Sequence, residues 1–115
     1  MKRGEIWTVA SGPDYSAKPR PAIILQADRF DRTDSITICG LTTTDIDAPL
    51  FRILIKSTKI NNLAAESFAM ADKINTVPRR KLGYRIGRLA DLEMAAVGRA
   101  AATFLGLGDG PIDRS

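Results

Sequence analysis

Residues 18–25 read Lys-Pro-Arg-Pro-Ala-Ile-Ile-Leu, a proline-bracketed arginine followed by an unbroken apolar run. The apolar residues 22–25 are too few for a helix and lack the alternation of a half-exposed strand, so we predict a strand buried on both faces. Pro19 and Pro21 fix the backbone on either side of Arg20 and remove two N–H donors. The arginine is therefore held in a restricted direction at the start of a buried strand. Such a strand is rigid and can position a functional side chain precisely.

The length of the chain, 115 residues, is enough for one hydrophobic core and too short for two. We predict a single domain over residues 1–108 and a disordered tail over residues 109–115. No stretch contains the roughly 20 apolar residues that span a bilayer, and no apolar segment follows the charged first residues. We therefore expect a cytoplasmic protein without membrane contact.

The absence of histidine and the single cysteine limit the kinds of catalytic and metal sites that the chain can form. The chain has no histidine, which excludes a histidine-pair ribonuclease and a histidine-based metal centre. Cys39 is the only cysteine, so neither an internal disulfide nor a cysteine zinc site is possible, and its apolar surroundings predict a core residue. We expect no metal and no cofactor, with proton transfer left to carboxylates, tyrosine, hydroxyls or arginine.

Short apolar segments separated by turn residues predict strands along most of the chain. Beyond the strand after Arg20, we expect strands at residues 4–10, 36–44, 50–56, 66–72 and 84–89. In the segment 50–56 the alternation should point Arg52 and Lys56 outward. The segment after residue 72 should either continue the strand or bend away.

The C-terminal third predicts one helical turn at residues 78–83 and one longer helix. Asp91 is expected to cap the longer helix and Gly106 to end it. Its buried stripe should consist of Met94, Val97, Ala101 and Phe104. Many short, mostly antiparallel strands with one C-terminal helix predict an α+β fold, a small SH3-like β-barrel capped by that helix.

Three groups of polar residues carry candidate chemistry, and each has a structural alternative. Arg20 either clamps a phosphate with its planar fork or bonds loop carbonyls or an acid. One of the threonines 42–44 offers a hydroxyl to the same phosphate, or these hydroxyls cap turns. Asp72 ends an apolar segment and is either a general base, an orienter for Arg20, or a turn residue or ion-pair partner.

Basic residues dominate the stretch 79–88, which holds five positive charges and no acid. Together with a net charge of +4 and an isoelectric point near 9.6, the run favours an anionic partner such as nucleic acid over a merely solvated face. Tyr15 and Tyr84 would stack on unpaired bases or serve in packing.

Five segments resemble, in order and spacing, the MazF/PemK family of toxin endoribonucleases, over residues 2 to 107. They are Lys2-Arg3-Gly4-Glu5-Ile6-Trp7, Lys18-Pro19-Arg20-Pro21-Ala22-Ile23-Ile24, Leu41-Thr42, Ala71-Asp72-Lys73-Ile74-Asn75-Thr76-Val77 and Leu82-Gly83-Tyr84-Arg85-Ile86-Gly87-Arg88-Leu89. The pattern differs from the family in the loop before Arg20, which usually carries a glutamate, at Met70, where some members have arginine, and at residues 73–76, which usually read Gln-Ile-Arg-Thr.

The resemblance implies a homodimeric SH3-like barrel that cleaves single-stranded RNA at short sequences without a metal, and that is bound by a cognate MazE/PemI-like antitoxin. The family's catalytic arginine and threonine fall on Arg20 and Thr42, and Asp72 matches a carboxylate used as a base in some members. We expect the 2′-OH of the RNA to attack the adjacent phosphorus. The residues expected to contact RNA are Asp14, Tyr15, Lys18, Thr43, Lys73, Asn75, Arg79, Arg80 and Arg85.

Two other readings of the sequence predict different behaviour. A non-catalytic nucleic-acid-binding barrel would explain the basic run and the fold, and would shift RNA on a gel without cutting it. A barrel that only binds proteins would show neither cleavage nor a salt-dependent affinity for RNA.

Overall fold

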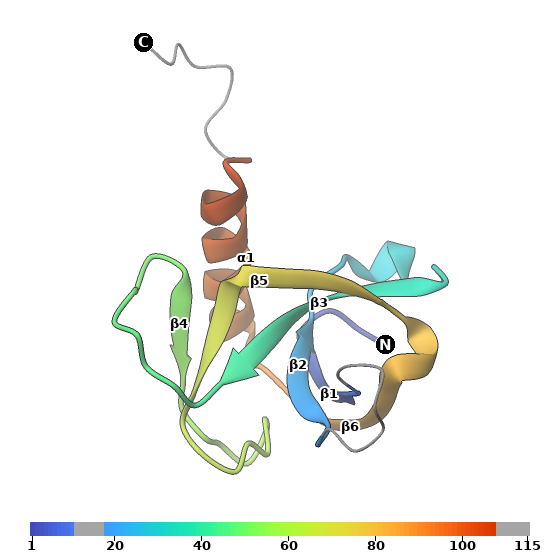
Figure 1. The fold of residues 1–115 in the computed structure, drawn as a ribbon, viewed down its shortest axis with the longest axis horizontal. Coiled ribbons are helices and arrows are strands. Elements are labelled where there is room, and N and C mark those ends of the chain that lie inside the picture. Colours follow the sequence, from blue (N-terminus) through green and yellow to red (C-terminus); the bar gives the residue numbers. More distant parts are fainter. Residues whose placement is uncertain (11–17, 108–115) are drawn as a thin grey trace, which may run out of the picture.

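The computed structural model describes residues 1–10 and 18–107. In this part of the chain, six strands form one sheet in the order β4-β5-β3-β2-β1-β6, and every pairing is antiparallel (Figure 1). The elements are β1 (Glu5–Val9), β2 (Arg20–Ile24), the 3-10 turn η1 (Asp28–Phe30), β3 (Ser35–Thr42), β4 (Arg52–Ile55), β5 (Ser67–Pro78), the 3-10 turn η2 (Arg79–Lys81), β6 (Leu82–Arg88) and the helix α1 (Asp91–Leu105). The predicted tail at 109–115 lies outside the described residues.

The predicted α+β class is confirmed, with an antiparallel sheet and one C-terminal helix. The sheet curls, but β4 and β6 are its two ends and are not paired with each other in the described part of the chain, so closure into a barrel is not seen. Within the same residues, no helix is long and apolar enough to cross a bilayer.

The strand β2 is buried on both faces, as its unbroken apolar run predicted. Ile23 packs into a cluster that includes Val97 of the helix, whereas Ile24 packs into a second cluster with Ile36 and Val77. The predicted core residue Cys39 is fully buried. Burial raises the pKa of its thiol to about 12, so the thiol is protonated at neutral pH. Two cores, one on each side of β2, hold the start of that strand in place.

The helix α1 packs against β4 and β5 (Figure 1) and differs from the expectation at its N-terminus and at one residue of its buried stripe. The residue at the N-cap position is Ala90, not Asp91, and its backbone N–H donates to the Glu93 carboxylate at 3.0 Å. Gly106 ends the helix with a positive φ of 72°, as predicted. Phe104, which was expected in the buried stripe, is instead 48% exposed. Its ring packs against that of Phe51, with ring centroids 5.6 Å apart.

The predicted direction of Arg52 is wrong. Arg52 does not point into solvent, since its side chain is only 8% exposed and is bonded to Asp72, whereas Lys56 is exposed as expected. Beyond Asp72 the strand β5 continues through residue 78, which is one of the two courses expected for this segment, and it is bent on the way. Its register with β3 shifts there. Cys39 pairs with Ile74 and Leu41 pairs with Ala69, so a step of two residues along β3 lies opposite a step of five residues along β5. Residues 70–73 therefore form a bulged corner, which follows from this shift.

Candidate functional site

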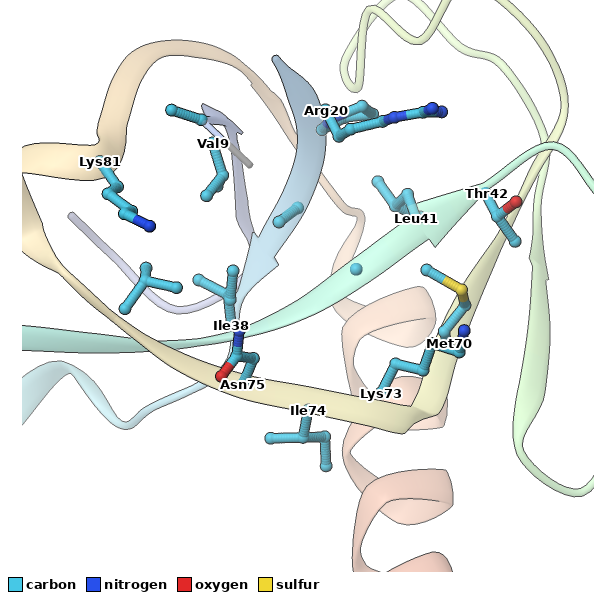
Figure 2. Close-up of a pocket in the computed structure, with 15 residues that line it drawn as sticks. Val9, Arg20, Ile38, Leu41, Thr42, Met70, Lys73, Ile74, Asn75 and Lys81 are labelled. Atoms are coloured by element: carbon cyan, nitrogen blue, oxygen red, sulfur yellow. The ribbon is translucent and has the colours of Figure 1, made fainter. Parts of the chain in front are cut away.

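A cavity of about 680 Å³ lies on the face of the sheet formed by β1, β2, β3 and β5 (Figure 2). This volume is in the range of ordinary ligand sites. Apolar side chains form much of its wall, and polar side chains are set around them. The lining residues are Val9, Ala10, Arg20, Pro21, Ala22, Ile38, Gly40, Leu41, Thr42, Met70, Lys73, Ile74, Asn75, Val77 and Lys81.

Arg20 is the first residue of β2 and is exposed. Its partner across the sheet is Val9, near the end of β1. In Figure 2 its side chain extends over Leu41 toward the end of β3, where Thr42 lies. Since the strand is fixed by both cores, the guanidinium is presented at the rim of the cavity.

Thr42 ends β3 and is half-buried. Its Oγ1 accepts a hydrogen bond from the backbone N–H of Thr44 at 3.2 Å, so the hydroxyl does cap a turn, one of the two roles considered for it. Accepting this bond leaves the hydroxyl proton able to donate to another group. Arg20 and Thr42, from different strands, thus line the same cavity, whereas Thr43 is exposed and is not among the lining residues.

The cavity is positively charged. Lys73 and Asn75 from β5 line it together with Lys81, and among residues 1–10 and 18–107 no lining residue carries a carboxylate. Lys81 was counted in the basic run but was not predicted as a site residue. It reaches the cavity because the backbone N–H of Ala10 donates to its carbonyl at 2.9 Å, beside the pairing of β1 with β6. No local sequence signal reveals this pairing.

Asp72 is not among the lining residues. Its carboxylate accepts two hydrogen bonds from Arg52, from Nε at 2.7 Å and from Nη2 at 3.0 Å. These bonds lower the pKa of Asp72 below its ordinary value and raise that of Arg52. Of the roles considered for Asp72, the ion-pair partner is the one that the structure contains.

The basic run 79–88 is not one continuous patch. Arg79 is half-buried and donates to the backbone carbonyls of Asp31 and Thr33, so it holds the loop before β3 in place. Arg85 bonds the Glu5 carboxylate at 3.0 Å. Each of these two predicted RNA contacts therefore has a structural partner.

The remaining predicted contacts are divided between the surface and the part of the chain that is not described. Lys18, Arg80 and Tyr84 are exposed, and Tyr84 has 68% of its surface accessible. Asp14 and Tyr15 lie outside the described residues. Among residues 1–10 and 18–107, no group of three or more acids or cysteines lies close enough together to hold a metal ion.

Comparisons with known proteins identify the family of this chain. The family model described as PemK-like, MazF-like toxin of type II toxin-antitoxin system matches residues 2–105. A relative from Mycolicibacterium smegmatis, named as a probable endoribonuclease MazF, is 49% identical over 107 residues, covering 93% of this chain and 98% of the relative.

Solved structures share the fold. An endoribonuclease in complex with its cognate antitoxin, from a mycobacterial species, superimposes with a TM-score of 0.73 at 25% identity, covering 93% of this chain and 96% of that one. The Mycobacterium tuberculosis toxin MazF-mt6 gives a TM-score of 0.75 at 22% identity over 89% of this chain and 96% of its own, a likeness of fold alone. On the match over residues 2–105, this chain belongs to the PemK-like, MazF-like toxin family of type II toxin–antitoxin systems.

Proposed function

We propose that this chain is the toxin of a type II toxin–antitoxin pair and that it cleaves single-stranded RNA in the cavity between β2, β3 and β5. The observation that carries the proposal is the meeting of Arg20 and Thr42 in one cation-lined cavity of a chain that belongs to this family. A cavity that is lined by three cationic side chains suits a polyanion. Its apolar wall suits unstacked bases.

The proposed reaction is a transesterification. The ribose 2′-OH loses its proton and attacks the adjacent phosphorus, and the bond to the 5′-oxygen of the next nucleotide breaks. The products are a 2′,3′-cyclic phosphate and a 5′-OH, and the leaving oxygen takes up a proton. No metal takes part in these steps.

Arg20 and Thr42 would act on the charge that grows on the non-bridging oxygens as the phosphorus is attacked. The role of Arg20 is electrostatic, because its guanidinium donates charge-assisted hydrogen bonds, and the Thr42 hydroxyl donates a second hydrogen bond. Fixed donors of this kind are typically worth about 100-fold to 1,000-fold in kcat each. The acceptor of the 2′-OH proton was predicted to be Asp14 or Asp72. Asp14 is not described, and Asp72 is considered below.

The RNA would run along the cavity past Lys73, Asn75 and Lys81, with Lys18, Thr43 and Arg80 as contacts at the rim. Arg79 and Arg85 are the weakest of the predicted contacts, because loop carbonyls and Glu5 already occupy their guanidinium groups. Since the nucleophile is the 2′-OH, DNA of the same sequence should bind and stay intact.

We further propose a homodimer of SH3-like barrels in the cytoplasm, bound by a cognate antitoxin. Support comes from the family match and from the mycobacterial endoribonuclease that was solved with its antitoxin. Phe104 and Leu105 at the end of α1 are about half exposed and would suit a contact between copies. An acidic antitoxin segment would be attracted to a chain of net charge +4.

The test is incubation of the protein with single-stranded RNA in EDTA, followed by mass spectrometry of the ends. Cyclic phosphate and 5′-OH ends are expected, and DNA should remain whole. The Arg20→Ala variant should lose cleavage without a change in the thermal unfolding midpoint. Arg99→Ala, which removes an exposed arginine of α1 that does not line the cavity, is the matched control.

The outcomes separate the alternatives. Intact RNA that still shifts on a gel would favour the non-catalytic binder. RNA that is neither cut nor shifted would favour a barrel that only binds proteins. Full cleavage by Arg20→Ala would refute the assignment of the site while leaving the activity in place.

A further inference from the structure

The corner of β5 at residues 70–73 is the point where the sheet turns from β4 toward the cavity. Here β5 gains residues relative to β3, and Figure 2 shows the strand bending sharply between Met70 and Lys73. Both of these residues line the cavity. The course of the corner therefore decides where two side chains of the proposed RNA site lie.

Met70 is confined at this corner. A Cβ atom added to Gly40 would lie 2.8 Å from the Met70 Cε, which means that the methionine covers the glycine on the cavity wall. Lys73 lies three residues further on, in the bulged segment that has no register partner on β3. A bulged segment lacks the regular ladder of hydrogen bonds, so other contacts must hold it.

The contacts that hold the corner come from the edge strand β4 and from Phe51, the residue that precedes it. Arg52 is the register partner of Met70, and the backbone N–H of Ala71 donates to the carbonyl of Phe51 at 2.8 Å. The Arg52 guanidinium then reaches along β5 to Asp72 with two parallel hydrogen bonds of 2.7 and 3.0 Å. The two side chains are 8% and 19% exposed, so water screens the pair only weakly.

We propose that the Arg52–Asp72 ion pair is a positioning element of the RNA-cleaving site, which clamps the corner of β5 so that Met70 and Lys73 face the cavity. The proposal rests on the function proposed above. In it, Asp72 acts through the corner and does not accept the proton of the 2′-OH. A bidentate arginine–carboxylate pair is geometrically specific, which suits it to fixing a bend.

The lowered pKa of Asp72 fits the role of a positioning residue better than the role of a general base. Hydrogen bonds from Arg52 hold its pKa below the ordinary value. A general base works best when its pKa lies near the working pH, and an enzyme usually raises a carboxylate pKa for that purpose. Both carboxylate oxygens are also occupied by Arg52 donors.

The experiment is a double-mutant cycle on RNA cleavage with Asp72→Asn, Arg52→Met and the double variant, with kcat and KM measured from pH 5 to 9. Under the proposal each single variant lowers kcat/KM by a similar factor, between about 10-fold and 100-fold for a displaced site. The double variant should be no worse than either single one, because both remove the same contact. The pH dependence of the residual activity should match the wild type.

A general base gives a different pattern. Asp72→Asn would then lower kcat far more than Arg52→Met does and would abolish the acidic limb of the pH profile. Arg52→Met would shift that limb to higher pH, since it removes the donors that lower the Asp72 pKa. Either result overturns the proposal, and the second remains decisive even where Asp72→Asn fails to fold.

A matched control variant completes the test. Asp31→Asn is the matched control, because Asp31 also pairs with a basic side chain, Lys2 at 3.6 Å, but on the exposed surface. It should cleave RNA like the wild type. Unchanged kcat and KM in both Asp72→Asn and Arg52→Met would refute the positioning role, whereas a wild type that does not cut RNA would refute the proposed function instead.

Discussion

Arg20 and Arg79 share a local setting, because each directly follows a proline and each adjoins a strand, and they have different roles in the fold. Arg20 stands exposed at the rim of the cavity. Arg79 is half-buried, and two backbone carbonyls of the loop before β3 accept its hydrogen bonds. The difference shows that a proline before an arginine does not by itself decide the role of the side chain, since the elements that lie opposite the arginine decide it.

The largest effect is expected from Arg20→Lys. Lysine keeps the charge but cannot present two parallel N–H donors to a phosphate. We expect kcat to fall by about 100-fold, with the thermal midpoint unchanged, in a single-turnover cleavage assay. An active lysine variant would mean that charge alone suffices at this position.

The next effect is expected from Arg79→Ala, and it should appear in stability. Loss of the guanidinium leaves the carbonyls of Asp31 and Thr33 without their donor. We expect unfolding in urea to become easier by about 1 to 3 kcal/mol, with kcat close to the wild type at a temperature where both are folded. A large loss of kcat without a loss of stability would place Arg79 beside Arg20 as a functional residue.

A smaller effect is expected from Lys81→Ala. This variant tests whether a basic side chain that lines the cavity contacts RNA, in contrast to Arg79, which bonds loop carbonyls. We expect a rise in KM of a few-fold and little change in kcat. The slope of log affinity against log salt should become shallower by about 0.7, the value for one contact to a single-stranded phosphate. Titrations of uncleavable RNA at several salt concentrations measure this slope, and an unchanged slope would remove Lys81 from the interface.

The smallest effect concerns acid stability. The pKa of Asp72 is lower in the folded protein than in the unfolded chain, mainly through the hydrogen bond from Arg52. The pair therefore stabilises the fold above the unfolded value and loses this contribution as the pH falls through the folded one. Urea unfolding from pH 7 to pH 3 should show a steeper loss of stability for the wild type than for Asp72→Asn. Parallel curves would contradict the pKa shift.

The sequence was sufficient for features that depend on local pattern. The doubly buried β2, the core cysteine and the end of α1 at Gly106 follow from an apolar run, from apolar neighbours and from glycine's tolerance of positive φ. The family segments were also sufficient to place Arg20 and Thr42 as a pair to look for, and they do line one cavity.

What the sequence did not reveal depends on pairing between distant strands. Arg52 was expected to face solvent because alternation along one strand says nothing about a carboxylate twenty residues later on its neighbour. Lys81 joins the cavity only through the pairing of β1 with β6. The helix cap was misplaced by one residue, since the N-cap residue is Ala90, whose backbone N–H donates to the Glu93 carboxylate.

The cavity wall draws on residues from Val9 to Lys81, and the strand β6 that follows holds β1 from the outside. A chain still emerging from the ribosome therefore lacks part of the cavity proposed to cleave RNA until most of its length has been synthesised.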